Sequence, residues 1–291
     1  MKRVILFYKY IHIAHPLALR SSQMKLAKRL SLKGRVIISS EGLNATLSGE
    51  DKDIEEYKRE LTLNENFSDI IFKEASVKED VFPKLSIKVR KEIVSLNQNL
   101  DIVSGKNKKG QYISPDDFHN IIQNNDEEVL IVDARNNYES AIGRFKKAIT
   151  PDIDNFRDFP KFINDIKKYR DKKIVMYCTG GVRCEKASSL LIKKGFKNVY
   201  QLKEGILNYA KYYPEDFEGK CYVFDSRIAV YLDNKNRTII SKCKHCGEDS
   251  DIYINCANKK CNLQFICCNK CEKKFKHSCS NRCMEIISVK A

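Results

Sequence analysis

A short segment near the middle of the chain, Cys178-Thr-Gly-Gly-Val-Arg183, constrains the fold more than any other feature of the sequence. An apolar run at residues 174–177 precedes this segment, and a helical pattern follows it and stops at Gly195. The order strand, tight loop, helix directs loop amides and the positive end of the helix dipole toward the Cys178 sulfur. Together with the charge of Arg183, such surroundings lower the pKa of a thiol and favour the reactive thiolate. Cys178 is therefore the predicted catalytic residue.

The number of residues between Cys178 and Arg183 limits which group the loop can hold. Cys178 and Arg183 form a Cys-x4-Arg loop, one residue shorter than the Cys-x5-Arg loop with which cysteine-dependent phosphatases hold a phosphate. A shorter ring suits one extra sulfur atom on the cysteine, and the segment resembles the active loop of the rhodanese family, where that cysteine carries a persulfide. We expect the Arg183 guanidinium to hold the anionic sulfur or a nearby phosphate. The competing interpretation is a buried strand-end cysteine without chemistry. The predicted active-site loop consists of Thr179, Gly180, Gly181, Val182, Arg183 and Cys184.

Length, charge and cysteine content limit the function classes. A chain of 291 residues is long enough for two or three domains. No apolar run reaches the length of a membrane helix, and the one at residues 4–10 is too short for a signal peptide, so we expect a cytoplasmic protein. Twelve cysteines in such a protein indicate thiol chemistry or metal binding rather than disulfides. The net charge of +15 favours nucleic acid as a partner, and a lysine-rich surface that only aids solubility is the alternative.

Residues 1–100 carry the pattern of a ferredoxin-like (acylphosphatase-like) α+β domain. The order strand, helix, strand, strand, helix, strand is typical of this fold. We interpret Gly34 as the stop of the first helix. Strands are predicted at residues 4–8, 35–40, 45–48, 70–73 and 86–90, and helices at 17–32 and 54–61.

Two polar groups in this domain are open to more than one interpretation. The first is a loop between strands that we interpret as a plain turn rather than a site; it contains Glu41, Asn44 and Thr46. The second is either a basic stripe for phosphate contacts or a solvated strand face; it contains Lys84, Lys88, Arg90 and Lys91.

Residues 124–218 alternate strands with helices, which predicts a parallel-sheet α/β domain with its site at the carboxyl ends of the strands. A polar, lysine-rich linker at residues 104–110 precedes it, and Ser114 and Pro115 open a helix as N-cap and first residue. Asp133, Arg135 and Glu139 resemble the motif that braces a rhodanese domain at this edge of its sheet. We favour a structural salt bridge for the first two over a functional role.

Composition shifts after Leu232, and residues 223–291 form a cysteine-rich region. Eight thiolates in four closely spaced pairs suit two tetrahedral zinc sites, which would contribute the folding energy that few apolar residues here can supply. The spacing leaves the pairing open, and free thiols in a disordered tail are the alternative. Cys267, His245 and His277 are spare ligands. The predicted metal ligands are Cys243, Cys246, Cys256, Cys261, Cys268, Cys271, Cys279 and Cys283.

Four stretches together resemble the bacterial tRNA uridine hydroxylases, rhodanese-containing proteins that act on the wobble uridine. They are residues 34–49, the segments 72–75 and 91–94, and the run Cys-Thr-Gly-Gly-x-Arg-Cys-Glu-Lys-Ala-Ser at 178–188. The family often has Gly where this chain has Ala45, and usually Gly where it has Glu204. Cys184 either resolves a Cys178 adduct as a disulfide or packs as a small residue.

The resemblance implies oxygen-dependent hydroxylation of uridine 34 of tRNA to 5-hydroxyuridine, with Cys178 essential and molecular oxygen as co-substrate. It does not name the electron donor. Two other hypotheses stay open. One is a rhodanese-type sulfurtransferase that carries sulfur as a Cys178 persulfide, and the other is a non-catalytic RNA-binding zinc protein.

Overall fold

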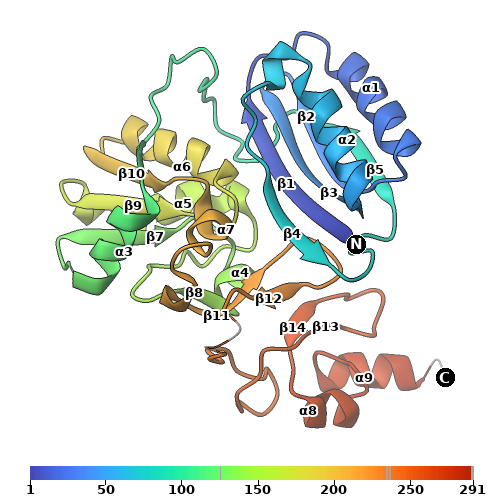
Figure 1. Ribbon diagram of the computed structural model, residues 1–291. Coiled ribbons are helices and arrows are strands. Elements are labelled where there is room, and N and C mark those ends of the chain that lie inside the picture. The colour runs from blue at the N-terminus through green and yellow to red at the C-terminus, as the bar shows by residue number, and fades with distance from the viewer. Residues whose placement is uncertain (125, 234, 236, 290–291) are drawn as a thin grey trace.

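The computed structural model describes every residue except 125, 234, 236, 290 and 291. The N-terminal part is a five-stranded sheet with two helices, and it stands beside the central domain, with the C-terminal region below (Figure 1). The strand order is β4-β1-β3-β2-β5, in which β5 is added parallel to β2 at the edge of an otherwise antiparallel sheet. Its elements are β1 (Lys2–Tyr10), α1 (Pro16–Arg29), β2 (Lys33–Ser39), β3 (Gly42–Glu50), α2 (Asp51–Thr62), η1 (Glu65–Phe67), β4 (Lys73–Val77) and β5 (Leu85–Val89).

Alternation along these strands divides the sheet into two faces. One set of side chains forms a core with α1 and α2, and it includes Ile5, Phe7, Val36, Ile38, Leu43, Ala45 and Leu47. Because side chains alternate along a strand, the intervening residues point to the opposite face. This open face, which carries Leu6, Tyr8, Arg35, Ile37, Asn44 and Thr46, meets the central domain.

Two local predictions for this domain are wrong. The strand predicted at residues 70–73 begins only at Lys73, because Ile70 ends a turn, with its amide bonded to Phe67 O, and packs in the core. Gly34 does not stop the first helix but lies inside β2 with φ +143°. A Cβ there would lie 2.1 Å from Thr46 O, so the close approach of β3 requires glycine at this position.

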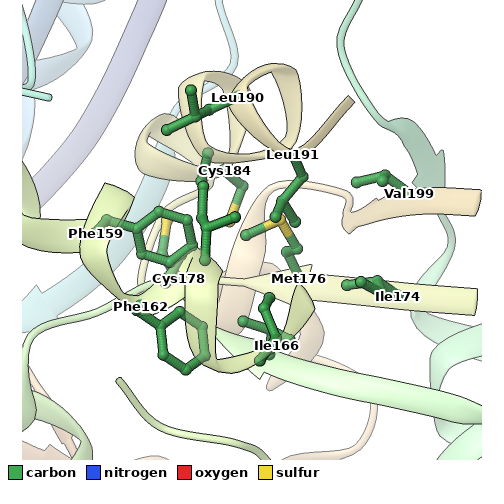
Figure 2. Packing of buried hydrophobic residues seen from close by; sticks show 14 of the residues in the cluster. Phe159, Phe162, Ile166, Ile174, Met176, Cys178, Cys184, Leu190, Leu191 and Val199 are labelled. Atoms are coloured by element: carbon green, nitrogen blue, oxygen red, sulfur yellow. The ribbon is translucent and has the colours of Figure 1, made fainter. Parts of the chain in front are cut away.

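The central domain is built on a parallel sheet in the order β6-β10-β9-β7. Figure 2 shows how Ile174 and Met176 of β9 pack between Leu190 and Leu191 on one helix and the phenylalanines of another. Ser114 Oγ accepts a hydrogen bond from Asp117 N at 3.1 Å, as expected of an N-cap. The elements are β6 (Gln111–Ile113), α3 (Pro115–Asn124), β7 (Val129–Asp133), α4 (Asn137–Ser140), η2 (Phe156–Asp158), α5 (Phe159–Asp165), η3 (Lys167–Tyr169), β9 (Lys173–Tyr177), α6 (Val182–Lys193), β10 (Asn198–Leu202) and α7 (Gly205–Tyr209).

A small antiparallel sheet connects this domain to the cysteine-rich region. It has the order β12-β11-β8. Tyr253 Oη donates to Tyr138 O at 2.5 Å, and Lys220 Nζ lies 2.8 Å from Asp251 Oδ2, so the C-terminal region is tied to the central domain. The elements are β8 (Gly143–Phe145), η4 (Pro214–Asp216), β11 (Phe217–Tyr222), β12 (Ala229–Tyr231), β13 (Tyr253–Asn255), β14 (Gln264–Ile266), α8 (Asn269–Lys274) and α9 (Asn281–Ser288). Over the described residues, no helix is both long and apolar enough to span a membrane.

Candidate active site

Cys178 lies directly after β9, at the carboxyl edge of the parallel sheet, and the loop that follows it turns into α6. Gly181 is the N-cap of this helix with φ +97°, and its amide donates to Cys178 Sγ at 3.1 Å. The loop therefore closes on the sulfur as its sequence predicts. The side chain of Cys178 is 1% exposed, so the sulfur can be reached only from a cavity.

The pKa of the Cys178 thiol reflects opposing causes. Burial raises it, while the thiol of Cys184, the charge of Arg183 and the amides of Arg183 and Cys184 lower it by favouring the anion, and the result is a pKa of about 6. At neutral pH the thiolate therefore predominates. Burial and the neighbouring Cys178 anion raise the pKa of Cys184 well above its usual range. Cys184 thus stays a neutral hydrogen-bond donor to the Cys178 sulfur.

Arg183 makes a contact that its sequence position does not reveal. Its guanidinium donates to Glu139 Oε1 at 2.5 Å and to Glu139 Oε2 at 2.7 Å, and both side chains are buried. The N–H groups directed at Glu139 are not available to a phosphate, and the Arg183 side chain lowers the pKa of Cys178 through its charge. Glu139 itself is held by α4, where it accepts from the Asn136 amide at 3.1 Å.

The neighbouring pair, Asp133 and Arg135, is structural. Arg135 Nη2 lies 2.6 Å from Asp133 Oδ2, and both side chains are fully buried. Arg135 Nη2 also donates to Gly143 O at 2.7 Å, which ties β7 to β8. This geometry agrees with the structural salt bridge predicted for the pair, whereas Glu139 of α4 pairs with Arg183 of the Cys178 loop.

The open face of the N-terminal sheet packs against the Cys178 loop. A Cβ on Gly180 would lie 2.7 Å from Leu6 Cδ2, and one on Gly181 would lie 2.8 Å from Tyr8 Oη. Tyr10 Oη donates to Val182 O at 3.1 Å. The absence of a side chain at both positions therefore allows close domain contact, and the left-handed backbone of Gly181 also favours glycine.

A cavity of about 520 Å³ lies between this sheet face and the Cys178 loop. Asn44 and Thr46, interpreted above as part of a plain turn, belong to β3 and line this cavity. Glu41 instead bonds the amide of Ile93 at 2.8 Å and pairs with Lys186 at 2.8 Å. Of the predicted basic stripe, Arg90 reaches the cavity wall. The lining includes Leu6, Arg35, Asn44, Thr46, Arg90, Asn155, Phe156, Arg157, Cys178, Thr179 and Phe224.

The two departures from the family pattern differ in their consequences. Ala45 is 2% exposed and packs under the helices of the N-terminal domain. Glu204 adopts φ +62°, in the left-handed region that glycine occupies without strain. Its carboxylate lies 4.0 Å from the buried Lys73 Nζ, so the extra charge beside the Cys178 loop has a partner. Burial lowers the pKa of Lys73, and the Glu204 charge opposes that change.

The eight predicted metal ligands gather into two groups of four. The first group is Cys243, Cys246, Cys268 and Cys271, and the second is Cys256, Cys261, Cys279 and Cys283. Within each group the sulfur atoms all lie within 4.8 Å of one another. This is the interleaved pairing, one of those that the sequence left open.

The distances within these groups fit a tetrahedral ion. The sulfurs of Cys246 and Cys268 are 3.7 Å apart, and Cys279 lies 3.6 Å from Cys261 and 3.8 Å from Cys283. Metal–sulfur bonds near 2.3 Å would give a tetrahedron with edges of about 3.8 Å, so these separations are compatible with a tetrahedral metal ion in each group.

The spare ligands are engaged elsewhere. His245 stacks on Phe275, and its Nε2 is 2.9 Å from Ser278 O. His277 pairs with Glu272 at 3.1 Å. The thiol of Cys267 donates to the carbonyl of Cys268. None of the three belongs to either group of four over the described residues.

Comparison with known proteins agrees with this architecture. Three family models match the chain: the UPF0176 acylphosphatase like domain over residues 2–93, the Rhodanese-like domain over 114–212, and the Rhodanase C-terminal model over 218–284. The tRNA uridine(34) hydroxylase of Onion yellows phytoplasma (strain OY-M) is 42% identical over 287 residues, covering 96% of this chain and 91% of the relative. The chain belongs to the tRNA uridine(34) hydroxylase family.

Other members of the family are equally similar. The Bacillus licheniformis tRNA uridine(34) hydroxylase is 41% identical over 285 residues, covering 97% of this chain and 88% of the relative. The Staphylococcus aureus (strain JH9) relative of the same name is 42% identical over 286 residues, covering 97% and 89%. The predicted family and the three-part fold are thus confirmed.

Proposed function

We propose that this protein hydroxylates uridine 34 of tRNA at C5, which gives 5-hydroxyuridine. One observation carries the proposal: a cysteine whose pKa is lowered to about 6 faces a cavity between two domains, in a chain whose relatives are named for this reaction. The C5–H bond is replaced by C5–OH. One atom of dioxygen enters the base, and the other leaves as water with two electrons and two protons from an external reductant.

Cys178 is the residue proposed to be essential, in a persulfide form. Its thiolate takes a sulfane sulfur from a persulfide donor, which leaves as a thiol. The loop supports this step because the six-residue ring around the sulfur is small and its amides stabilise an anion. A sulfurtransferase would use the same first step, so loop geometry alone favours neither reaction.

The partner and the metal follow from charge and thiol geometry. The net charge of +15 supports binding of tRNA through its phosphates. The two groups of four cysteines support two structural zinc ions, which would hold the C-terminal region folded. A cytoplasmic location stays a prediction.

Nucleoside analysis of tRNA tests the function. Bulk tRNA from cells that lack the protein should lose 5-hydroxyuridine and its derivatives at position 34, and the wild-type gene should restore them. Cys178→Ser should fail to restore them with an unchanged thermal midpoint, since serine is nearly isosteric but a poor nucleophile. Cys221→Ser, the same exchange at a buried cysteine outside the loop, is the control. Loss of thiolated bases would favour the sulfurtransferase, and unchanged tRNA would favour the non-catalytic RNA-binding protein.

A further inference from the structure

The position of Cys178 restricts how a base can reach it. The side chain is 1% exposed, and the cavity between the N-terminal sheet and the loop leads to it. A base stacked inside an anticodon loop cannot bring C5 to a sulfur at this depth. Enzymes that act on such bases take the nucleotide out of the stack, and extrusion costs little where the base is unpaired. A volume of about 520 Å³ is within the range of small-molecule sites.

The walls of the cavity offer both polar and aromatic groups. On the sheet side, Arg35 pairs in register with Thr46, and Ile37 with Asn44. Phe224 also lines the cavity and is 40% exposed. The Arg183 guanidinium lies over its ring, 5.8 Å from the centroid, and the exposed remainder of the ring can stack on a base.

Three arginines at the cavity differ from most others in the chain. Arg35, Arg90 and Arg157 are exposed and line the cavity, and none has a carboxylate partner among the residues that the structure describes. By contrast, six arginines pair with Asp or Glu: Arg3, Arg29, Arg59, Arg135, Arg183 and Arg227. Guanidinium groups without a carboxylate match phosphate oxygens in geometry and charge.

We propose that this cavity holds one extruded pyrimidine nucleotide. The base enters with C5 toward Cys178 and stacks on Phe224, while Arg35, Arg90 and Arg157 hold the backbone phosphates on either side of it. The inference rests on the proposed function, because it places uridine 34 at the Cys178 loop. It adds the binding mode and the residues that provide it, which come from the N-terminal domain as well as the central one.

Salt dependence of RNA binding tests the arginines. A fluorescent anticodon stem-loop RNA is titrated with the full-length protein over a series of salt concentrations. Each phosphate contact on a single strand contributes about 0.7 to the steepness of the slope of log K against log salt. The triple variant Arg35→Gln, Arg90→Gln, Arg157→Gln removes three such contacts, so the magnitude of its slope should be smaller than that of wild type by about 2. A slope equal to that of wild type would overturn the assignment.

A second triple variant controls for net charge. Lys25→Gln, Lys28→Gln and Lys52→Gln remove three positive charges from α1 and α2, which cover the other face of the sheet. These lysines are exposed and have no ion-pair partner among the described residues. The control should keep the wild-type slope. An equal flattening in both triples would overturn the proposal in favour of a diffuse electrostatic interface.

Photochemical crosslinking tests the placement of the base. A stem-loop with 5-iodouridine at position 34 is irradiated in complex with the protein, and crosslinked peptides are identified by mass spectrometry. Peptides that contain Cys178 or Phe224 are expected, and the same label at a paired stem position should not give them. Crosslinks only outside the cavity, or none, would overturn the proposal.

The proposed reaction and the proposed binding mode can be refuted separately. If wild-type protein supports 5-hydroxyuridine formation but the arginine triple keeps the wild-type slope, the binding mode is wrong and the function stands. If tRNA in the deletion strain is unchanged while the crosslinks reach Cys178, the cavity binds a nucleotide and the proposed reaction is wrong.

Discussion

Replacing Cys184 by alanine should raise the pKa of Cys178 from about 6 to about 7. Burial opposes ionisation of Cys178, and the Cys184 thiol is one of the groups that offset it. A hydrogen bond to a charged group contributes about 1.5–3 kcal/mol, and a thiol is a weak donor, so about 1.4 kcal/mol, or one pKa unit, is the expected loss. Cys184→Ser keeps a donor, and its Cys178 pKa should stay near the wild-type value.

Peptide-resolved alkylation measures this change. Short pulses of iodoacetamide at a series of pH values label thiolates, and mass spectrometry quantifies the Cys178 peptide. Its labelling should rise through pH 6 in wild type and in Cys184→Ser, and about one pH unit higher in Cys184→Ala. Burial raises the pKa of Cys221 to about 12, so labelling of Cys221 would reveal unfolding.

The comparison of the two variants decides the role of Cys184. If the pH midpoint of Cys178 labelling is the same in Cys184→Ala and Cys184→Ser, with Cys221 unlabelled, the hydrogen-bond argument is refuted and Cys184 is a packing residue. A Cys178–Cys184 disulfide in protein purified without reductant would support the resolving role that the sequence left open.

Three further outcomes are expected. Arg183→Lys keeps the charge but can make only one hydrogen bond to Glu139, so the free energy of unfolding in urea should fall by about 1.5–3 kcal/mol; an unchanged midpoint would contradict the buried pair. Cys271→Ser removes one ligand of the first thiol group, and metal analysis should show one zinc ion per chain instead of two; loss of both ions would mean that the groups are interdependent. Gly180→Ala should lower the thermal midpoint, and Leu6→Ala in the same chain should recover part of the loss; no recovery would place the strain elsewhere.

Local pattern predicted the parts of the site that are close in sequence. The loop from Cys178 to Arg183 combines a strand end, two glycines and a helix start within one turn of chain, so its shape follows from residue type and spacing. The partner of Arg183 could not be predicted from local pattern, because Glu139 is 44 residues away in the sequence. Only the packing of α4 against the loop brings them together, and no periodicity in the sequence records that contact.

The two groups of four cysteines likewise depend on contacts between segments that are distant in the sequence. Spacing identified all eight cysteines but not their combination, because pairs on separate loops can combine in more than one way. The β13–β14 hairpin lies between the two halves of the first group in the sequence, and the loop that joins its strands carries Cys256 and Cys261, close to Cys283 of α9. The interleaved pairing is therefore a consequence of a hairpin whose strands are only three residues long each, too short for a strong sequence signal.

The role of the N-terminal domain follows from what the Cys178 loop lacks. A six-residue ring with a low-pKa thiol can accept a sulfur atom, yet nothing within the ring recognises a nucleotide. Recognition needs a second wall, and in the proposed binding mode the open face of the N-terminal sheet provides it, with Leu6 and Tyr8 packed close to Gly180 and Gly181. A side chain on either glycine would displace the side chain of Leu6 or Tyr8 that packs against it. Gly180 and Gly181 thus allow the binding surface of the N-terminal domain to lie close to the Cys178 sulfur of the central domain.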